Sequence, residues 1–133
     1  MIGLDTNVLV RYLTQDDPRQ SALATAVFAG LTPDAPGYLS REVMVELVWV
    51  LERAYDLPRH DIAEAIDGLL SSREIVVESP DRVGLAAERY RKGGAGFSDQ
   101  MIALAAHDAG CDRILTFDRK AIALAGMSAV PGA

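Results

Sequence analysis

Short apolar runs alternate along this chain with longer segments in which apolar residues recur at helical spacing. The runs at residues 2–4, 38–39, 75–78 and 113–117 are bounded by polar or turn residues, which is typical of buried strands. Residues 127–130 form a candidate edge strand. The segments between these runs predict helices, which we expect over residues 7–13, 18–30, 41–55, 58–71, 80–92, 98–109 and a short stretch after 118.

Several helix boundaries are marked by residues that favour them for local reasons. Asp17 precedes Pro18, and Gln20 stands three positions after Asp17, so Asp17 is predicted to cap the helix that follows. Ser40 is suited to cap the next helix in the same way. The GGAG segment at 93–96 breaks the pattern, and Ser98 or Asp99 is then the expected cap.

Alternation of strand and helix predicts an α/β fold, in which a parallel sheet carries helices on both faces. The length of 133 residues fits one domain, 1–133, with a single core. In sheets of this kind the functional site lies beyond the carboxyl ends of the strands.

Composition narrows the class of protein. Half of the residues are apolar, yet no apolar run reaches the ~20 residues of a membrane span, and Met1 leads directly into a predicted strand, so we expect neither a membrane segment nor a signal peptide. Cys111 is the single cysteine, which we expect to be buried in a chain from the reducing cytoplasm. The net charge of −6 argues against a passive nucleic-acid coat, but it is compatible with an enzyme that cuts nucleic acid through metal ions.

Three aspartates fall where helices begin at one edge of the predicted sheet. Asp5 follows the first strand, Asp118 follows the strand ILTF, and Asp99 stands at the start of the helix after GGAG. Each of them alone is readily explained as a helix cap. Their shared position at the carboxyl edge favours a common site.

Glu46 is the only residue in VMVELVWVL that is not apolar. It lies in the second turn of its helix, so it cannot cap that helix. Its neighbours on the same helical face are Val43, Trp49 and Val50, and among them a carboxylate needs a partner or a proton. It is either a rim residue or ion-paired, or it points into a site that holds cations.

Four clustered carboxylates stay ionised together only if cations neutralise them. Oxygen ligands without a Cys or His pattern suit Mg²⁺ or Mn²⁺. His60 and His107 are isolated, and we expect both at the surface. The pattern predicts metal-assisted phosphodiester hydrolysis, with Asp5, Glu46, Asp99 and Asp118 as the catalytic and metal-binding residues.

Four segments, in this order and in a chain of this length, resemble a known family. They are IGLDTNVLVRYL, the helix from Ser40 to Glu46 with its continuation ELVWVL, GGAGFSDQMIALAA, and ILTFDR. The chain resembles the PIN-domain ribonucleases and, within them, the VapC toxins of type II toxin–antitoxin systems.

The resemblance implies a three-layer α/β/α sandwich around a mostly parallel sheet. It implies that Asp5, Glu46, Asp99 and Asp118 are the acidic quartet of an endoribonuclease that uses Mg²⁺ or Mn²⁺. By the same resemblance Thr6, Asn7 and Thr116 are small polar residues that support the quartet. The implied partners are an RNA substrate and a cognate VapB-like antitoxin protein, with a homodimer as the expected assembly.

Two other readings remain open at this point. Phosphotransfer and phosphatase domains also gather aspartates at the carboxyl edge of a parallel sheet, although they commonly place a lysine there. A non-catalytic interaction module is the second alternative. Apolar residues of the first three predicted helices are expected to leave an exposed groove for the antitoxin: Val8, Leu9, Tyr12, Leu13, Val27, Phe28, Val48 and Trp49.

Overall fold

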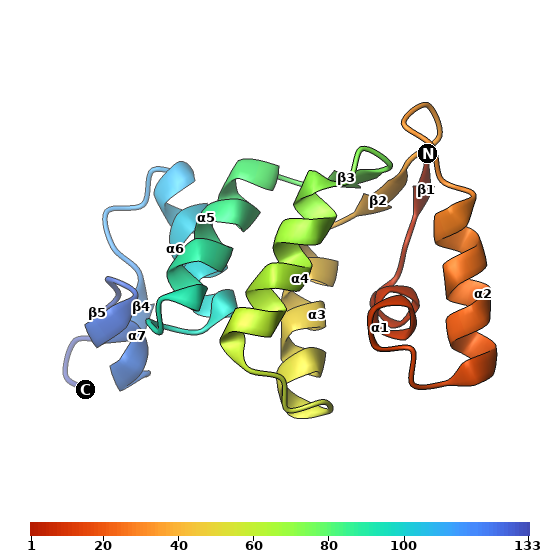
Figure 1. Cartoon of the computed structure of the whole chain (residues 1–133). Coiled ribbons are helices and arrows are strands. Elements are labelled where there is room, and N and C mark those ends of the chain that lie inside the picture. Colours follow the sequence, from red (N-terminus) through yellow and green to blue (C-terminus); the bar gives the residue numbers. More distant parts are fainter.

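A computed structural model describes all of residues 1–133, as seven helices and five short strands (Figure 1). The strands are β1 (Ile2–Gly3), β2 (Gly37–Leu39), β3 (Ile75–Val77), β4 (Leu115–Thr116) and β5 (Ser128–Ala129). The helices are α1 (Thr6–Thr14), α2 (Pro18–Ala29), α3 (Arg41–Arg53), α4 (Arg59–Ser71), α5 (Pro80–Arg91), α6 (Phe97–Asp108) and α7 (Arg119–Leu124). Every predicted helix and strand is present. No helix combines the length and the apolar character that crossing a bilayer requires.

All strand pairs are parallel, which confirms the predicted α/β class. One sheet has the order β1-β2-β3, with Gly37 opposite both Ile2 and Ile75. A Cβ on Gly37 would lie 2.8 Å from the Leu4 side chain, so a larger residue there would require Leu4 to move. β4 and β5 form a separate pair, in which Leu115 is opposite Ser128. The sheet is therefore divided, and β1 and β4 are edge strands.

The helix starts follow local chemistry at most of the predicted positions. Asp17 accepts a hydrogen bond from the Gln20 amide at 2.9 Å, and Ser40 accepts one from the Val43 amide at 3.2 Å. The expectation for α6 was wrong, because its N-cap is Gly96, which offers no side-chain bond, and Ser98 and Asp99 lie within the first turn. A chain turning through GGAG already has an extended residue at Gly96, so no polar cap is required to begin the helix.

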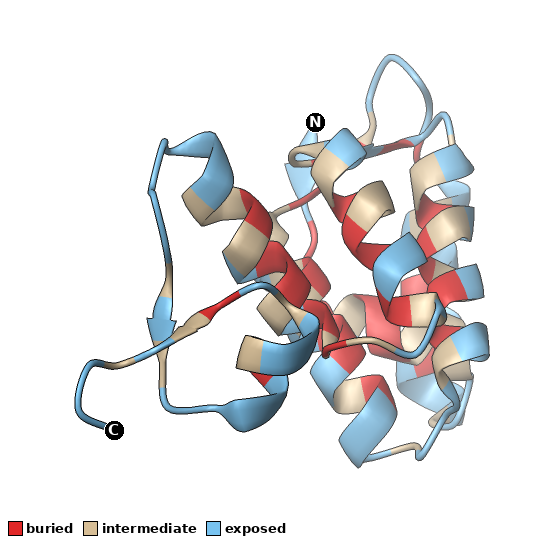
Figure 2. Cartoon of the chain, turned by 90° about the vertical axis from the view of Figure 1, so that its left-hand side faces the viewer, coloured by how far each residue is buried: buried red, intermediate tan, exposed pale blue.

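The core lies between the three-stranded sheet and the helices that follow it. It consists of 21 buried residues, among which Leu39, Met44, Leu47 and Ile62 are completely inaccessible. Every member lies between Leu4 and Leu104 in the sequence. Figure 2 shows the same concentration of buried residues in the helices of this part of the molecule. We call residues 2–108 the body.

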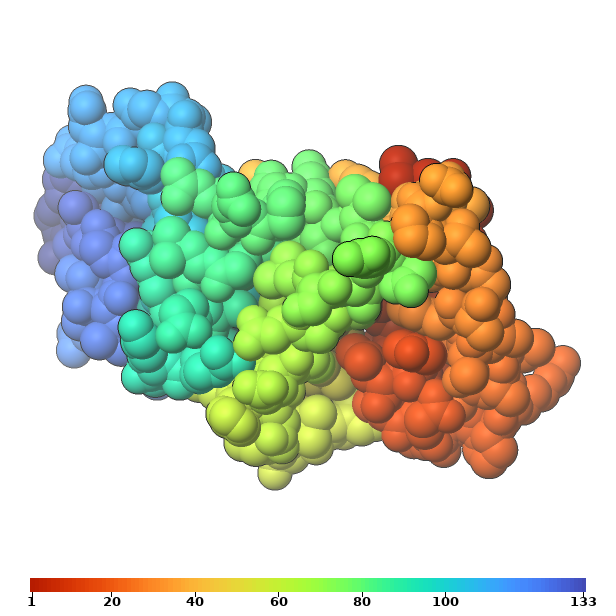
Figure 3. All heavy atoms as spheres, turned by 45° about the horizontal axis from the view of Figure 1, so that its top comes forward, coloured from red at the N-terminus to blue at the C-terminus, as the bar shows by residue number.

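The segment from β4 through α7 to β5, residues 115–129, is called here the C-terminal unit. It lies at the opposite end of the molecule from β1, with α3, α4, α5 and α6 between them (Figures 1 and 3). Only Ala121 and Met127 of this unit are buried. The connection that leads to it from α6 carries Cys111, which is exposed rather than buried as expected, because no element packs over this stretch.

One arginine fixes the turn between α5 and α6. The Arg59 Nη1 donates to the carbonyl oxygens of Tyr90, Gly94 and Ala95, at 3.0, 2.9 and 3.2 Å. Its guanidinium also lies 4.6 Å from the centre of the Tyr90 ring. Burial of that ring, and secondarily the charge of Glu52, raises the pKa of Tyr90 to about 12. The turn that precedes Asp99 is therefore held by α4.

Candidate active site

Asp5 begins the candidate site at the carboxyl end of β1. It is the N-cap of α1, and its carboxylate accepts a hydrogen bond from the Thr6 amide at 2.7 Å. The residue is exposed, so capping uses one carboxylate oxygen and leaves the group accessible to solvent. The capping and the functional interpretations of Asp5 are compatible with each other.

Thr6 connects Asp5 to Glu46. The Thr6 hydroxyl donates to the Glu46 Oε1 at 2.5 Å, and Thr6 itself is buried. α1 packs against α3, which brings Glu46 to the start of α1 although the two residues are far apart in the sequence. Glu46 is exposed, and it has a partner, as a carboxylate in this helix was expected to need. Its partner is a hydroxyl, which no spacing in the sequence marks.

Asp5 and Glu46 line one pocket of about 410 Å³. The other residues that line it are Thr6, Asn7, Val10, Arg11, Val50, Ala54 and Tyr55. Thr6 and Asn7 lie beside the carboxylates, as the resemblance implied. The pocket brings together a carboxylate from each of two elements with small polar groups between them.

Arg11, the basic residue that lines this pocket, pairs with groups other than Asp5 and Glu46. Arg11 forms an ion pair with Asp16 at 3.1 Å and also donates to Gln20 at 2.8 Å. The Tyr55 hydroxyl donates to Asp16 at 2.6 Å, and this bond, followed by the one from Thr14, lowers the pKa of Asp16 to about 2. Asp16 and Tyr55 were not identified from the sequence, because their pairing depends on how α3 meets the loop after α1. Arg11 is thereby balanced without using Asp5 or Glu46.

The other two predicted acids do not line this pocket. Asp99 is half-buried in the first turn of α6, and Asp118 is exposed at the start of α7. Asp118 accepts hydrogen bonds from the amides of Lys120 and Ala121, at 2.8 and 3.3 Å. The prediction that all four carboxylates share one pocket within a chain was wrong. For Asp118 the reason is the divided sheet, which separates the carboxyl end of β4 from that of β1.

The oxygen atoms of this pocket are of the type that binds a hard divalent cation, but there are too few of them to hold one. The carboxylates of Asp5 and Glu46 and the neighbouring hydroxyl and amide oxygens are ligands of the type that Mg²⁺ or Mn²⁺ prefers. However, no three Asp, Glu, His or Cys side chains are arranged to hold one metal ion. A single chain in this conformation therefore presents half of the predicted quartet. The two histidines, His60 and His107, are exposed, as expected.

A second, more apolar pocket lies between α1 and α2. It has a volume of about 260 Å³, and it is lined by Asn7, Val8, Arg11, Gln20, Leu23, Ala24 and Val27. Leu23 is 60% exposed and was missing from the predicted groove, whereas Leu9 and Val48 belong to the core instead. Trp49 is exposed on α3, as predicted. The expected exposed apolar surface exists on these helices, although its members differ in part.

Two comparisons with known proteins agree with this architecture. Residues 2–127 match the family model of the PIN domain. The chain is also similar to a VapC ribonuclease of Aquifex aeolicus (strain VF5), with 27% identity over 118 residues, which is 88% of this chain and 87% of that protein. These matches confirm the resemblance that the four sequence segments indicated.

Proposed function

This chain belongs to the PIN domain family, and we propose from that premise that it is a divalent-metal-dependent endoribonuclease. It hydrolyses RNA phosphodiester bonds and acts as the toxin of a toxin–antitoxin pair in the cytoplasm. The similarity to a VapC ribonuclease over most of both chains supports the substrate class and the toxin role. The phosphotransfer alternative has no support here, because no lysine lines the pocket that contains Asp5 and Glu46.

The observation that carries this proposal is the link between Asp5, Thr6 and Glu46. The backbone amide of Thr6 orients one carboxylate, and the hydroxyl of the same residue orients the other. Two carboxylates held in this way beside open pocket volume are suited to receive a cation that carries phosphate oxygens. A binding module without catalysis would not need this arrangement.

We propose that Mg²⁺ or Mn²⁺ is held by the quartet Asp5, Glu46, Asp99 and Asp118. Such a cation would lower the pKa of a water molecule and stabilise the charge on the leaving oxygen. The chain itself contributes oriented carboxylates, and Thr6 prevents Glu46 from turning away. Asp5 and Glu46 supply part of this set in one chain, so the set needs a further contribution from Asp99 and Asp118.

The proposed protein partner is a VapB-like antitoxin, and the pocket between α1 and α2 is a suitable place for its apolar side chains. Leu23 and Val27 expose apolar surface there, and Asn7 lines both this pocket and the acidic one. A cationic side chain of the antitoxin could reach Asp5 from this position. Basic residues near the ends of α5 and α7, such as Arg89, Lys92 and Arg119, are proposed to contact RNA.

The test is cleavage of a panel of structured RNAs by the purified chain, with Mg²⁺, with Mn²⁺ and with a chelator. We expect cleavage only with a divalent cation, and its loss in Asp5→Asn. Asparagine caps helices as well as aspartate does, so α1 keeps its start and the melting temperature should not fall. Asp34→Asn is the matched control, since Asp34 is an exposed aspartate in the loop before β2.

Expression in cells extends the test to the toxin role. The wild-type chain and Asp34→Asn should arrest growth, whereas Asp5→Asn should not. Full cleavage by a folded Asp5→Asn variant would refute the proposed function, and so would cleavage that persists in the chelator.

A further inference from the structure

Each chain has four open strand edges, two of which belong to β1 and β4. β1 pairs with β2 on one side only, and β4 pairs with β5 on one side only. Both edges expose apolar residues: Ile2 is 52% exposed on β1, Leu115 is 46% exposed on β4, and the adjacent Phe117 is 78% exposed. An open, apolar strand edge is a template for pairing with another strand. A sheet of two strands is also marginal in water, so β4 and β5 need further support.

The two edges also carry acids at the same offset. Asp5 stands two residues after the end of β1, and Asp118 stands two residues after the end of β4. Pairing β4 with β1 in parallel, with Ile2 opposite Leu115, would place the carboxyl ends of both strands at one edge. Strands in a sheet are ~4.8 Å apart, so Asp118 would then lie beside Asp5 and Glu46.

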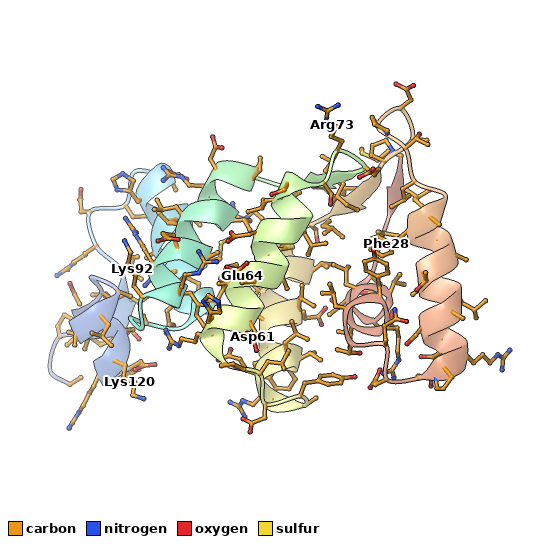
Figure 4. All side chains as sticks on the ribbon, viewed as in Figure 1. Phe28, Asp61, Glu64, Arg73, Lys92 and Lys120 are labelled. Carbon is orange, nitrogen blue, oxygen red and sulfur yellow. The ribbon has the colours of Figure 1, made fainter.

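The chain does not bring its own two edges together. The C-terminal unit and β1 are at opposite ends of the molecule (Figure 1), and in the space-filling view of Figure 3 the middle of the chain separates them. Figure 4 labels Lys120 on α7 and Phe28 beside α1, and the same separation is visible between these side chains. Phe28 stacks on Tyr12, which places it next to α1.

The position of the C-terminal unit is determined by the local structure at the end of α6. The amide of Gly110 donates to the His107 carbonyl oxygen and that of Cys111 to the Ala106 carbonyl oxygen, both at 3.0 Å. Gly110 has φ of +84°, so this is the glycine-terminated helix end that redirects a chain. Arg82 also donates to Asp108 at 2.9 Å and ties the end of α6 to α5. The connection thus leaves the helix in a defined direction, away from β1.

We propose that the partner of the β1 and β4 edges is a second copy of this chain, which exchanges its C-terminal unit. β4 of one copy adds in parallel to β1 of the other, and the reverse pair forms by two-fold symmetry, so the β1 and β4 edges of both copies are paired. The joined sheet has the order β3-β2-β1-β4-β5, with β4 and β5 from the second copy. Each acidic pocket then combines Asp5 and Glu46 of one copy with Asp118 of the other. In this respect the inference rests on the proposed function and completes its metal site.

Disulfide trapping tests the strand pairing without any reference to activity. In a Cys111→Ser background, Ile2→Cys and Leu115→Cys are introduced into the same chain, and the protein is oxidised mildly. The proposed register puts these positions opposite each other, within the range that a disulfide spans. We expect a covalent species of twice the 14.3 kDa chain mass on a non-reducing gel, and a dimer of the unmodified protein by light scattering.

The matched control is Ile2→Cys with Ser128→Cys. Ser128 is opposite Leu115 in β5, so in the joined sheet it lies two strand spacings from Ile2, beyond the reach of a disulfide. This control should not cross-link. A disulfide formed within one chain by Ile2→Cys/Leu115→Cys, which runs at the mass of the monomer, would overturn the exchange. Free thiols after oxidation would also overturn it.

Mixed dimers test the shared site. Differently tagged Asp5→Asn and Asp118→Asn chains are co-expressed, and the mixed dimer is isolated through both tags. One of its two sites then has Asp5 and Asp118 intact, so Mn²⁺ binding and RNA cleavage should recover to about half of the wild-type level per dimer. Each variant alone should give neither.

The failures of the two proposals are distinguishable. A mixed dimer that stays inactive and binds no Mn²⁺, beside an active wild type, would overturn the shared site. A wild type that cleaves no RNA would count against the proposed function, and the cross-linking result would still decide whether the strands exchange.

Discussion

The body and the C-terminal unit differ in how many core residues they bury and in which acids of the predicted quartet they carry. The body contains the whole 21-residue core, whereas the C-terminal unit buries only Ala121 and Met127. Yet each region carries acids of the predicted quartet: Asp5, Glu46 and Asp99 are in the body, and Asp118 is in the unit. The comparison teaches that the region that stabilises this fold does not contain all four of the predicted acids.

The difference has a simple physical origin in strand length and packing. The strands of the unit have two residues each, and a pair of such strands offers few hydrogen bonds and little apolar contact. In the body, β2 has neighbours on both sides, and α3, which packs against α1, α4 and α6, buries Met44, Leu47, Val48 and Leu51. A weakly supported unit with open edges is suited to exchange between copies.

Removing the C-terminal unit should separate its contribution to the metal site most clearly from its contribution to stability. A chain that ends at Asp108 should lose cleavage and Mn²⁺ binding completely, because Asp118 is gone. Its free energy of unfolding should fall by only about 1.5–3 kcal/mol, which is the contribution of one buried side chain such as Met127. Metal titration calorimetry and thermal unfolding measure the two effects. A shortened chain that does not fold would show that the unit belongs to the core after all.

Leucine truncations compare the packing of the two regions directly. Leu47 is fully buried in α3, so Leu47→Ala should destabilise the protein by about 2–5 kcal/mol through lost contacts and a cavity. Leu124 in α7 is 51% exposed, and Leu124→Ala should change stability by no more than about 0.5 kcal/mol. Chemical denaturation at equilibrium measures both. Equal losses would contradict the division of the molecule that we describe.

Substitution of Thr6 tests how the body orients its part of the site. Thr6→Val keeps the shape but removes the hydroxyl that donates to Glu46, a bond to a charged group that contributes about 1.5–3 kcal/mol. We expect Mn²⁺ affinity to fall roughly 10–100-fold, as for the loss of a residue that orients a ligand. Thr6→Ser keeps the donor and should restore most of the affinity. If serine and valine behave alike, the hydroxyl has no orienting role.

The smallest expected effect is a pH dependence that belongs to the body alone. The Tyr55 hydroxyl and then Thr14 lower the pKa of Asp16 from its ordinary 3.8 to about 2, so the ionised form stabilises the fold. This contribution is present above pH 3.8 and is lost as the pH falls toward 2. Asp16→Asn should therefore melt below the wild type at pH 7, and the two melting curves should converge near pH 2. A difference that does not change with pH would contradict this origin.

Local chemistry explains why much of this fold was predictable from the sequence. Asp17, Ser40 and Asp118 cap helices where expected, because a cap depends on residues within one turn of it. The prediction that Ser98 or Asp99 caps α6 was wrong, since the backbone of the GGAG turn needs no polar side chain. The exposure of Glu46 was left open, because a helical pattern shows which residues share a face but not whether that face meets a pocket or the core.

The sequence by itself determined the order of helices and strands, the placement of Asp5 and Asp118 just after parallel strands, and membership of the PIN domain family. Only the tertiary structure decided that Thr6 joins Asp5 to Glu46 and that β1 and β4 both remain edge strands. Strand pairing uses backbone groups that every residue carries, so two-residue strands contain almost no side-chain information about their neighbours. Their partners are therefore set by how the helices between them pack, which here leaves β4 at the far end of the molecule from β1.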